Sequence, residues 1–157
     1  MVTIREARLP DDKRVLLGFI EGLQRYEAEF EPDRRLDAAY AEDQFAWLMR
    51  TAGKGAIFLA EIGGRAAGWI MVYADEAPPY VIDAERRHAV ICELFVDPPV
   101  RGQGAGRALM AACEQWAKAQ GLSVIHIGHL SLNSRAAKVY EEAGYAPYVV
   151  LRRKRLK

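Results

Sequence analysis

The stretch Val96-Asp97-Pro98-Pro99-Val100-Arg101-Gly102-Gln103-Gly104-Ala105-Gly106-Arg107 decides the fold of this chain. It follows an apolar run at 89–96, typical of a buried central strand, and precedes an amphipathic segment at 108–120, typical of a helix. A plain strand-to-helix turn needs one glycine, whereas this loop has three. Glycines let a ligand approach the backbone, and the first amides of a helix are unpaired and partially positive. With Arg101 and Arg107 beside them, these glycines predict a phosphate-binding site.

The spacing of the glycines argues against two common phosphate sites. In the dinucleotide fingerprint Gly-x-Gly-x-x-Gly, the last glycine would fall on Arg107. A P-loop for nucleoside triphosphates requires Gly-x-x-x-x-Gly-Lys-Ser/Thr, which the chain lacks. The phosphate ligand is therefore expected to be of another kind.

Around this loop the sequence predicts short alternating elements. Apolar spacing and turn residues indicate strands at 3–8, 56–62, 66–74, 89–96, 123–130 and 145–151, and helices opening at 10–12 and spanning 36–49, 108–120 and 133–143. Gly63-Gly64 is typical of a hairpin turn, and 27–35 and 75–87 are predicted loops. The order β-α-α-β-β-β-α-β-α-β predicts the α/β class: one domain, 1–157, with a mixed sheet and helices on both faces.

Composition narrows the classes of protein further. The chain has 157 residues, 51% hydrophobic and 27% charged, and a net charge of +1, which does not favour nucleic-acid binding. It has no apolar run of membrane length, and its charged beginning does not resemble a secretory signal, so a cytoplasmic setting is expected. Cys92 and Cys113 predict neither a disulfide framework nor a metal cluster. Residues 1–90 carry a net charge of −4 and residues 91–157 one of +5. The difference suits an anion site in the second half, or reflects incidental segregation on solvated faces.

Two motifs in the correct order resemble one family. Arg101-x-x-Gly104-x-Gly106, after a strand ending in Val96-x-Pro98, is similar to the acyl-CoA pyrophosphate loop of the GNAT N-acetyltransferase superfamily. Asn133-x-x-Ala136-x-x-x-Tyr140-x-x-x-Gly144-Tyr145 resembles the helix that follows the family's fifth strand. The element order matches along nearly the whole chain, but specific motifs lie only within 89–145. The resemblance implies a sheet splayed between its fourth and fifth strands, with acyl-CoA in the cleft.

The resemblance also implies which residues hold acetyl-CoA. Backbone groups of Leu94, Phe95 and Val96 would pair with the pantetheine arm, and the amides of Arg101, Gly102, Gln103, Gly104, Ala105, Gly106 and Arg107 would bind the pyrophosphate. Asn133 would contact the pantetheine. A helix N-cap is the alternative role for Asn133, which it or Ser134 could supply, and the two roles are compatible. No metal is expected.

The resemblance assigns Tyr140 as the general acid that protonates the departing thiolate. A hydroxyl there would stabilise the developing negative charge on sulfur in any case. The alternative is a core aromatic, because Ala136, Tyr140 and Ala143 share one helix side.

Glu93 is the candidate base, since it is the only charge in the apolar run 89–96 and a carboxylate there costs desolvation unless it meets water or a ligand. A solvated or ion-paired structural role is its alternative. Some relatives use a carboxylate on the fifth strand instead, where this chain has Gly128. His126 and His129 lie beside it and are lesser candidates.

The acceptor pocket implied by the family would be lined by 26–33 and 75–80. Both segments are acidic and contain tyrosine, which suits a cationic amine, although acidic loops are as often merely solvated. The expected function is an acetyl-CoA-dependent N-acetyltransferase, in which a primary amine of a small molecule or peptide attacks directly within a ternary complex. The alternative is an inactive acyl-CoA-binding sensor or interaction module. No nucleic acid or membrane partner is expected. Polyamine, aminoglycoside, amino acid and protein amine remain open as acceptors, as do the acyl group and a homodimeric state.

Overall fold

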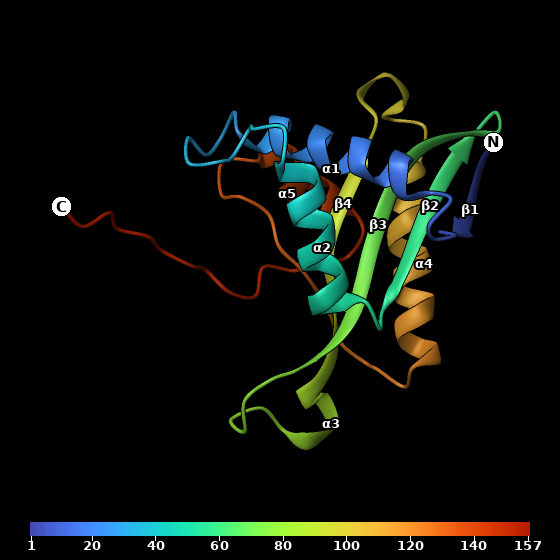
Figure 1. Ribbon diagram of the computed structural model, residues 1–157. Helices are drawn as coiled ribbons and strands as arrows, with labels where there is room; N and C mark the ends of the chain where they lie inside the picture. The colour runs from blue at the N-terminus through green and yellow to red at the C-terminus, as the bar shows by residue number, and fades with distance from the viewer.

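The centre of the fold is one mixed sheet of five strands in the order β1-β2-β3-β4-β5, seen in a computed structural model that describes residues 1–157 (Figure 1). The strands are β1 (Val2–Glu6), β2 (Ala56–Ile62), β3 (Arg65–Glu76), β4 (Arg87–Val96) and β5 (Ile125–Ile127). The helices are α1 (Lys13–Glu27), α2 (Tyr40–Ala52), α3 (Asp83–Arg86), α4 (Ala105–Ala119) and α5 (Ser134–Glu142), and a short 3-10 turn covers Pro98–Val100. The first four strands pair antiparallel, and β5 joins β4 in parallel. The predicted α/β class with a mixed sheet is confirmed.

Helices cover both faces of the sheet, as the alternation of apolar residues along β3 requires. Trp69 and Met71 face α1 and α2, where they pack in a core that includes Leu16. Ile70 faces the opposite side and packs with Leu109 of α4. Every one of these five side chains is at most 1% exposed, so the cleft between β4 and β5 is built on two rigid cores. None of the helices combines the length and apolar character needed to cross a membrane.

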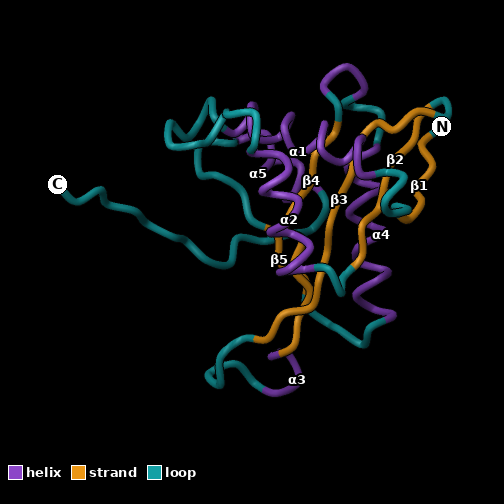
Figure 2. Tube along the Cα trace, viewed as in Figure 1, coloured by secondary structure: helices purple, strands orange, loops and turns teal.

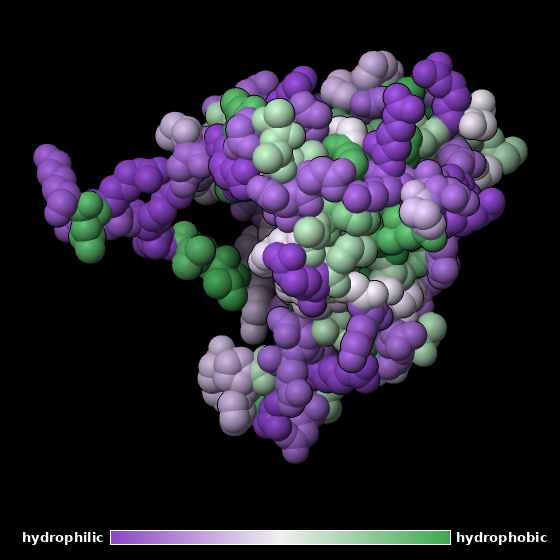
Figure 3. All heavy atoms as spheres, in the orientation of Figure 1, coloured by the Kyte–Doolittle hydropathy of each residue, from purple (hydrophilic) through white to green (hydrophobic).

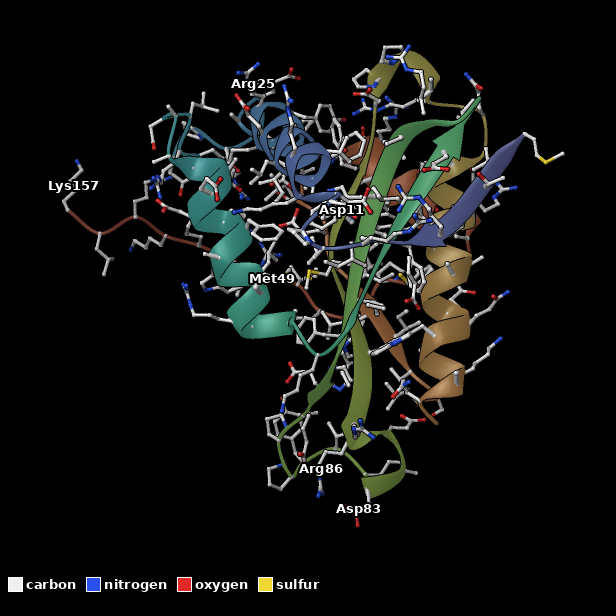
Figure 4. The ribbon with its side chains drawn as sticks, turned by 45° about the vertical axis from the view of Figure 1, so that its right-hand side comes forward. Asp11, Arg25, Met49, Asp83, Arg86 and Lys157 are labelled. Atoms are coloured by element: carbon white, nitrogen blue, oxygen red, sulfur yellow. The ribbon has the colours of Figure 1, made fainter.

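The β3–β4 hairpin extends well beyond its neighbours as an arm. β3 continues to Glu76, which pairs with Arg87, so the ladder occupies part of the segment predicted as the loop 75–87. Figure 4 places Asp83 and Arg86 at the tip of this arm, where their side chains form an ion pair at 2.7 Å. The arm therefore carries the loop 75–80 away from the body of the sheet (Figure 1).

The sheet opens between β4 and β5. Only Ala89, Val90 and Ile91 of β4 have partners in β5, and the second half of β4, residues 92–96, has none on that side. Figure 2 shows the short β5 beside one half of β4 only. The splay expected between the fourth and fifth strands is confirmed. It leaves β5-facing backbone groups of β4 without a strand partner.

The predicted last strand at 145–151 is wrong. Residues 146–157 make no backbone–backbone hydrogen bond, and Tyr148 through Leu151 are 72–93% exposed. Figure 3 shows the tail leaving the body with hydrophobic atoms uncovered. Although the residues favour extended structure, a strand needs a partner, and β5 offers an edge of three residues only. Arg153 instead pairs with Glu31 and with Asp33, the latter at 3.1 Å.

Candidate active site

The splay forms a cleft of about 460 Å³ at the end of β4. Its walls come from α1, β4, the glycine loop, β5 and α5. The lining residues that bear on its chemistry are Tyr26, Glu27, Cys92, Glu93, Arg101, Gly106, Arg107, Gly128, His129, Asn133, Arg135 and Tyr140. Residues far apart in the sequence thus meet in one cavity of the size that holds a small ligand.

The glycine loop delivers unpaired helix amides to this cleft. Gly102 and Gly104 have φ values of +82° and +90°, which L side chains rarely adopt, and Gly104 is the N-cap of α4. A Cβ added at Gly106 would meet nothing closer than a methyl group of Val96 at 3.8 Å. Because there is room for a ligand atom beside Gly104 and Gly106, a phosphate can approach the amides of the first turn of α4.

Three arginines surround the same end of the cleft: Arg101, Arg107 and Arg135. None of them takes part in any ion pair of the structure. Nε of Arg101 donates to the carbonyl oxygen of Val96 at 2.8 Å, and its guanidinium lies 5.1 Å from the centre of the Tyr26 ring. Burial, followed by the charge of Arg135, lowers the pKa of Arg101. Three neighbouring positive charges that lack acidic partners favour binding of a polyanionic ligand.

A β-bulge in β4 turns Glu93 toward the helices α1 and α2. Met71 pairs with Glu93 and Val72 with Ile91, so Cys92 is the extra residue without a partner. In a regular strand Ile91 and Glu93 would share one face, but Ile91 packs in the core beside α4 and Glu93 contacts α2. The bulge therefore brings the carboxylate to the side of the sheet that α1 and α2 cover.

Glu93 is mostly buried and held by a single neutral donor. Nε2 of Gln44 on α2 donates to Oε1 of Glu93 at 3.0 Å. Desolvation raises the pKa of Glu93 to about 7, while the hydrogen bond from Gln44 acts in the opposite direction. Glu27 raises this pKa further and Arg34 lowers it. A carboxyl group that titrates near neutral pH is suited to accept a proton from an amine.

Tyr140 lines the opposite wall, on α5. Burial, and then the charge of Glu27, raises the pKa of Tyr140 to about 12, so its hydroxyl keeps its proton at neutral pH. Its ring also packs against the core on the α4 side and lies 6.5 Å from the Tyr145 ring. Tyr140 thus lines the cleft and also packs in the core, and its role as general acid stays a prediction.

Asn133 is buried and makes the contacts of a helix cap. Its Oδ1 accepts from the backbone N–H of Ala136 at 3.1 Å, which confirms the N-cap role. The hydroxyl of Tyr26 on α1 donates to the same oxygen at 3.4 Å. This contact links α1 to α5 across the cleft. The expected contact of Asn133 with pantetheine stays a prediction.

Other predicted residues divide between cleft and surface. Gln103 is exposed and does not line the cleft, whereas Leu94, Phe95, Val96 and Ala105 do. His129 lines it, and its Nδ1 lies 2.8 Å from the carbonyl oxygen of Leu130. His126 lies outside, between the rings of His88 at 4.4 Å and Tyr148 at 4.9 Å.

The two acidic segments expected to line the acceptor pocket, 26–33 and 75–80, also differ in whether they reach the cleft. Tyr26 and Glu27 line the cleft, but no residue of 75–80 does, because the β3–β4 arm carries that loop away. The expectation that 75–80 lines an acceptor pocket is therefore not met in this cleft, and it stays a prediction for the acceptor. Arg135 and Gln44 were not predicted. Arg135 could have been found from its place two residues after Asn133, in the first turn of a predicted helix facing the loop.

Comparison with known proteins identifies the family. The model of the acetyltransferase (GNAT) family matches residues 15–145. The chain belongs to this family. The family region includes the glycine loop, Glu93 and Tyr140, so the resemblance seen in the two motifs is confirmed.

Individual relatives are distant. An uncharacterised N-acetyltransferase of Methanocaldococcus jannaschii is 30% identical over 68% of this chain, and the chain spans only 45% of that relative's length. One from Archaeoglobus fulgidus is 29% identical over 84% of this chain and 82% of its own length. The solved structure of a predicted acetyltransferase with acetyl-CoA from Clostridium acetobutylicum has a TM-score of 0.71 and 19% identity. The structural match covers 97% of this chain and 96% of the Clostridium protein. At that identity the structural likeness supports the fold alone.

Proposed function

We propose that this GNAT protein transfers an acetyl group from acetyl-CoA to a primary amine by direct attack within a ternary complex. The observation that carries the proposal is the single cleft that joins a cationic, glycine-lined end to an end bearing Glu93 and Tyr140. A pyrophosphate fits the first end, since the α4 amides are uncovered and three arginines lack acidic partners. The β5-facing backbone of β4 is available to pair with an extended arm. Membership of the family, and the acetyl-CoA with which the Clostridium protein was solved, support the same donor.

In this proposal the residues of the chain handle two protons. Glu93 takes a proton from the bound ammonium group, directly or through water, and so frees the nitrogen lone pair. The nitrogen forms a bond to the acetyl carbonyl carbon and releases its second proton to water, while the carbon–sulfur bond breaks. Tyr140 donates its proton to the departing sulfur and is reprotonated from solvent. Positioning both reactants in one cleft supplies the entropic part of the rate enhancement.

Acidic side chains at the acceptor end support a cationic amine. Glu27 and Glu93 line that end, and the charge of Glu27 contributes to the raised pKa of Glu93. An ammonium group placed between them relieves this repulsion. The identity of the amine within that class, and the acyl group beyond acetyl, stay outside the proposal, as does a homodimeric state.

The test is release of free thiol from acetyl-CoA in the presence of a panel of primary amines, with mass spectrometry of the products. We expect thiol release that depends on an amine and on Glu93. Calorimetry with acetyl-CoA and with NAD runs alongside. Binding of acetyl-CoA without release for any amine would instead support an inactive acyl-CoA-binding module, and binding of NAD alone would refute the donor.

A further inference from the structure

Gln44 makes one side-chain hydrogen bond, and it is directed at the candidate base. The residue lies on α2, one helical turn after Tyr40, and its Nε2 reaches Oε1 of Glu93 at 3.0 Å across 49 positions of sequence. No other hydrogen bond of Gln44 or Glu93 through side-chain atoms is present. Oε2 of Glu93 therefore has no protein donor, it is not among the fully buried side-chain atoms that lack a partner, and Glu93 lines the cleft.

The chemistry of the donor matters as much as its position. An arginine or lysine in this place would hold the carboxylate and also neutralise it, which depresses a carboxyl pKa strongly and makes a weak base. A side-chain amide fixes the carboxylate without bringing a charge. The hydrogen bond from the amide stabilises the ionised form of the buried carboxylate, but the pKa of the carboxyl group stays near neutral pH.

The remaining groups around Glu93 do not replace this contact. Glu27 faces it from α1 and Tyr40 from α2, and both lack a positive charge. Cys92 precedes it on β4 and keeps its proton, because burial raises the pKa of that thiol to about 12. The cation that acts on Glu93 is Arg34, which is already paired with Glu27 at 3.2 Å.

We propose that Gln44 is a positioning residue for amine deprotonation, fixing Glu93 through Oε1 so that Oε2 is presented to the acceptor nitrogen. This inference rests on the proposed function, in which Glu93 is the base. It adds the residue that sets the orientation of Glu93 and the pH range in which Glu93 works.

The experiment is the pH dependence of kcat/KM for Gln44→Met and Gln44→Glu, with any amine that the wild type accepts. Methionine keeps the volume of glutamine but donates no hydrogen bond. Losing a hydrogen bond to a charged group should move the acidic limb to higher pH by about one pH unit. A second carboxylate in Gln44→Glu should move it further, because like charges disfavour ionisation. Gln115→Leu, on the exposed side of α4, is the matched control and should leave the limb unchanged.

A second measurement does not depend on turnover. Carboxyl ¹³C titration by NMR, with Glu93→Gln to assign the resonance, reports the pKa of Glu93 directly. A higher pKa in Gln44→Met, together with the shifted limb, supports the proposal. An unmoved limb and an unmoved titration in a folded variant overturn it.

Failure of the proposed function gives a different result. If the wild type releases no thiol with any amine, the acetyl-transfer proposal fails, while the NMR titration still shows whether Gln44 controls Glu93. If Glu93→Gln keeps a normal acidic limb, Glu93 is not the base, and the role proposed for Gln44 in deprotonation is overturned with it.

Discussion

The substitution Glu93→Gln should make the fold more stable at alkaline pH and leave it nearly unchanged at acidic pH. Burial raises the pKa of Glu93 from 4.5 to about 7 in the folded protein. Between these values the unfolded chain has lost its proton while the folded chain still holds it, so the stability of the wild type falls as pH rises through this window. The difference between the two pKa values corresponds to about 3 kcal/mol of unfolding free energy. Allowance for the solvent that reaches the side chain leaves about 2–3 kcal/mol.

The magnitude can be read from thermal unfolding. For a domain of this size 1 kcal/mol corresponds to roughly 2–4 °C in Tm, so Glu93→Gln should unfold roughly 5–10 °C above the wild type at pH 8 and close to it at pH 4. The amide oxygen of the variant side chain can still accept the hydrogen bond from Gln44, so the comparison isolates the charge. Glu141→Gln, at an exposed position of α5, is the control and should show no such pH dependence. If the Tm difference between wild type and Glu93→Gln is the same at pH 4 and pH 8, the carboxylate is not desolvated in the folded protein.

Three further changes test the remaining parts of the cleft. Tyr140→Phe should lower kcat by roughly 100-fold with little change in acetyl-CoA affinity, since the ring still packs; unchanged kcat, with chemistry limiting the rate, would make Tyr140 a core residue only. Gly106→Asp should weaken acetyl-CoA binding roughly 100-fold in calorimetry, because the backbone has room for a side chain there and the aspartate would repel the pyrophosphate from the α4 amides. Unchanged affinity would show that the pyrophosphate binds elsewhere. Asn133→Ala should cost about 1 kcal/mol of unfolding free energy in denaturant titration and Asn133→Asp much less, because Asp restores the oxygen that accepts the cap hydrogen bond; equal losses would show that this oxygen does not account for the cost.

Local sequence signals predicted the glycine loop and the elements that flank it. Three glycines with two arginines at a strand-to-helix junction are typical of few kinds of site. The loop and the helix after it were therefore predictable from residues next to one another in the chain. Tyr140 was singled out by the resemblance to the family, and it lines the cleft together with Asn133 because one helix carries both. Predictions of this kind succeed because the partners are within a few residues in the chain.

Positions that depend on a distant partner were not predictable. The alternation of apolar residues gives no sign that Cys92 is a bulge, yet the bulge decides which face Glu93 occupies. Gln44 is one of many polar residues on a helix until the sheet is built beneath it. The prediction of a strand at 145–151 failed for the same physical reason. Val149 and Val150 favour extended backbone, but a strand forms only where a neighbouring strand shares its backbone hydrogen bonds.

The charge distribution along the cleft bears on what leaves it after the reaction. In the proposed reaction an amine would enter the end lined by Glu27 and Glu93 as a cation, and the amide made from it would be neutral at that nitrogen. The attraction that brought the substrate in is therefore cancelled by acetylation itself. The proposed thiol product would keep all its phosphates and would face the same three arginines as before. We therefore expect the acetylated amine to depart readily and to inhibit weakly, and free CoA to compete with acetyl-CoA and to be the slower product to dissociate.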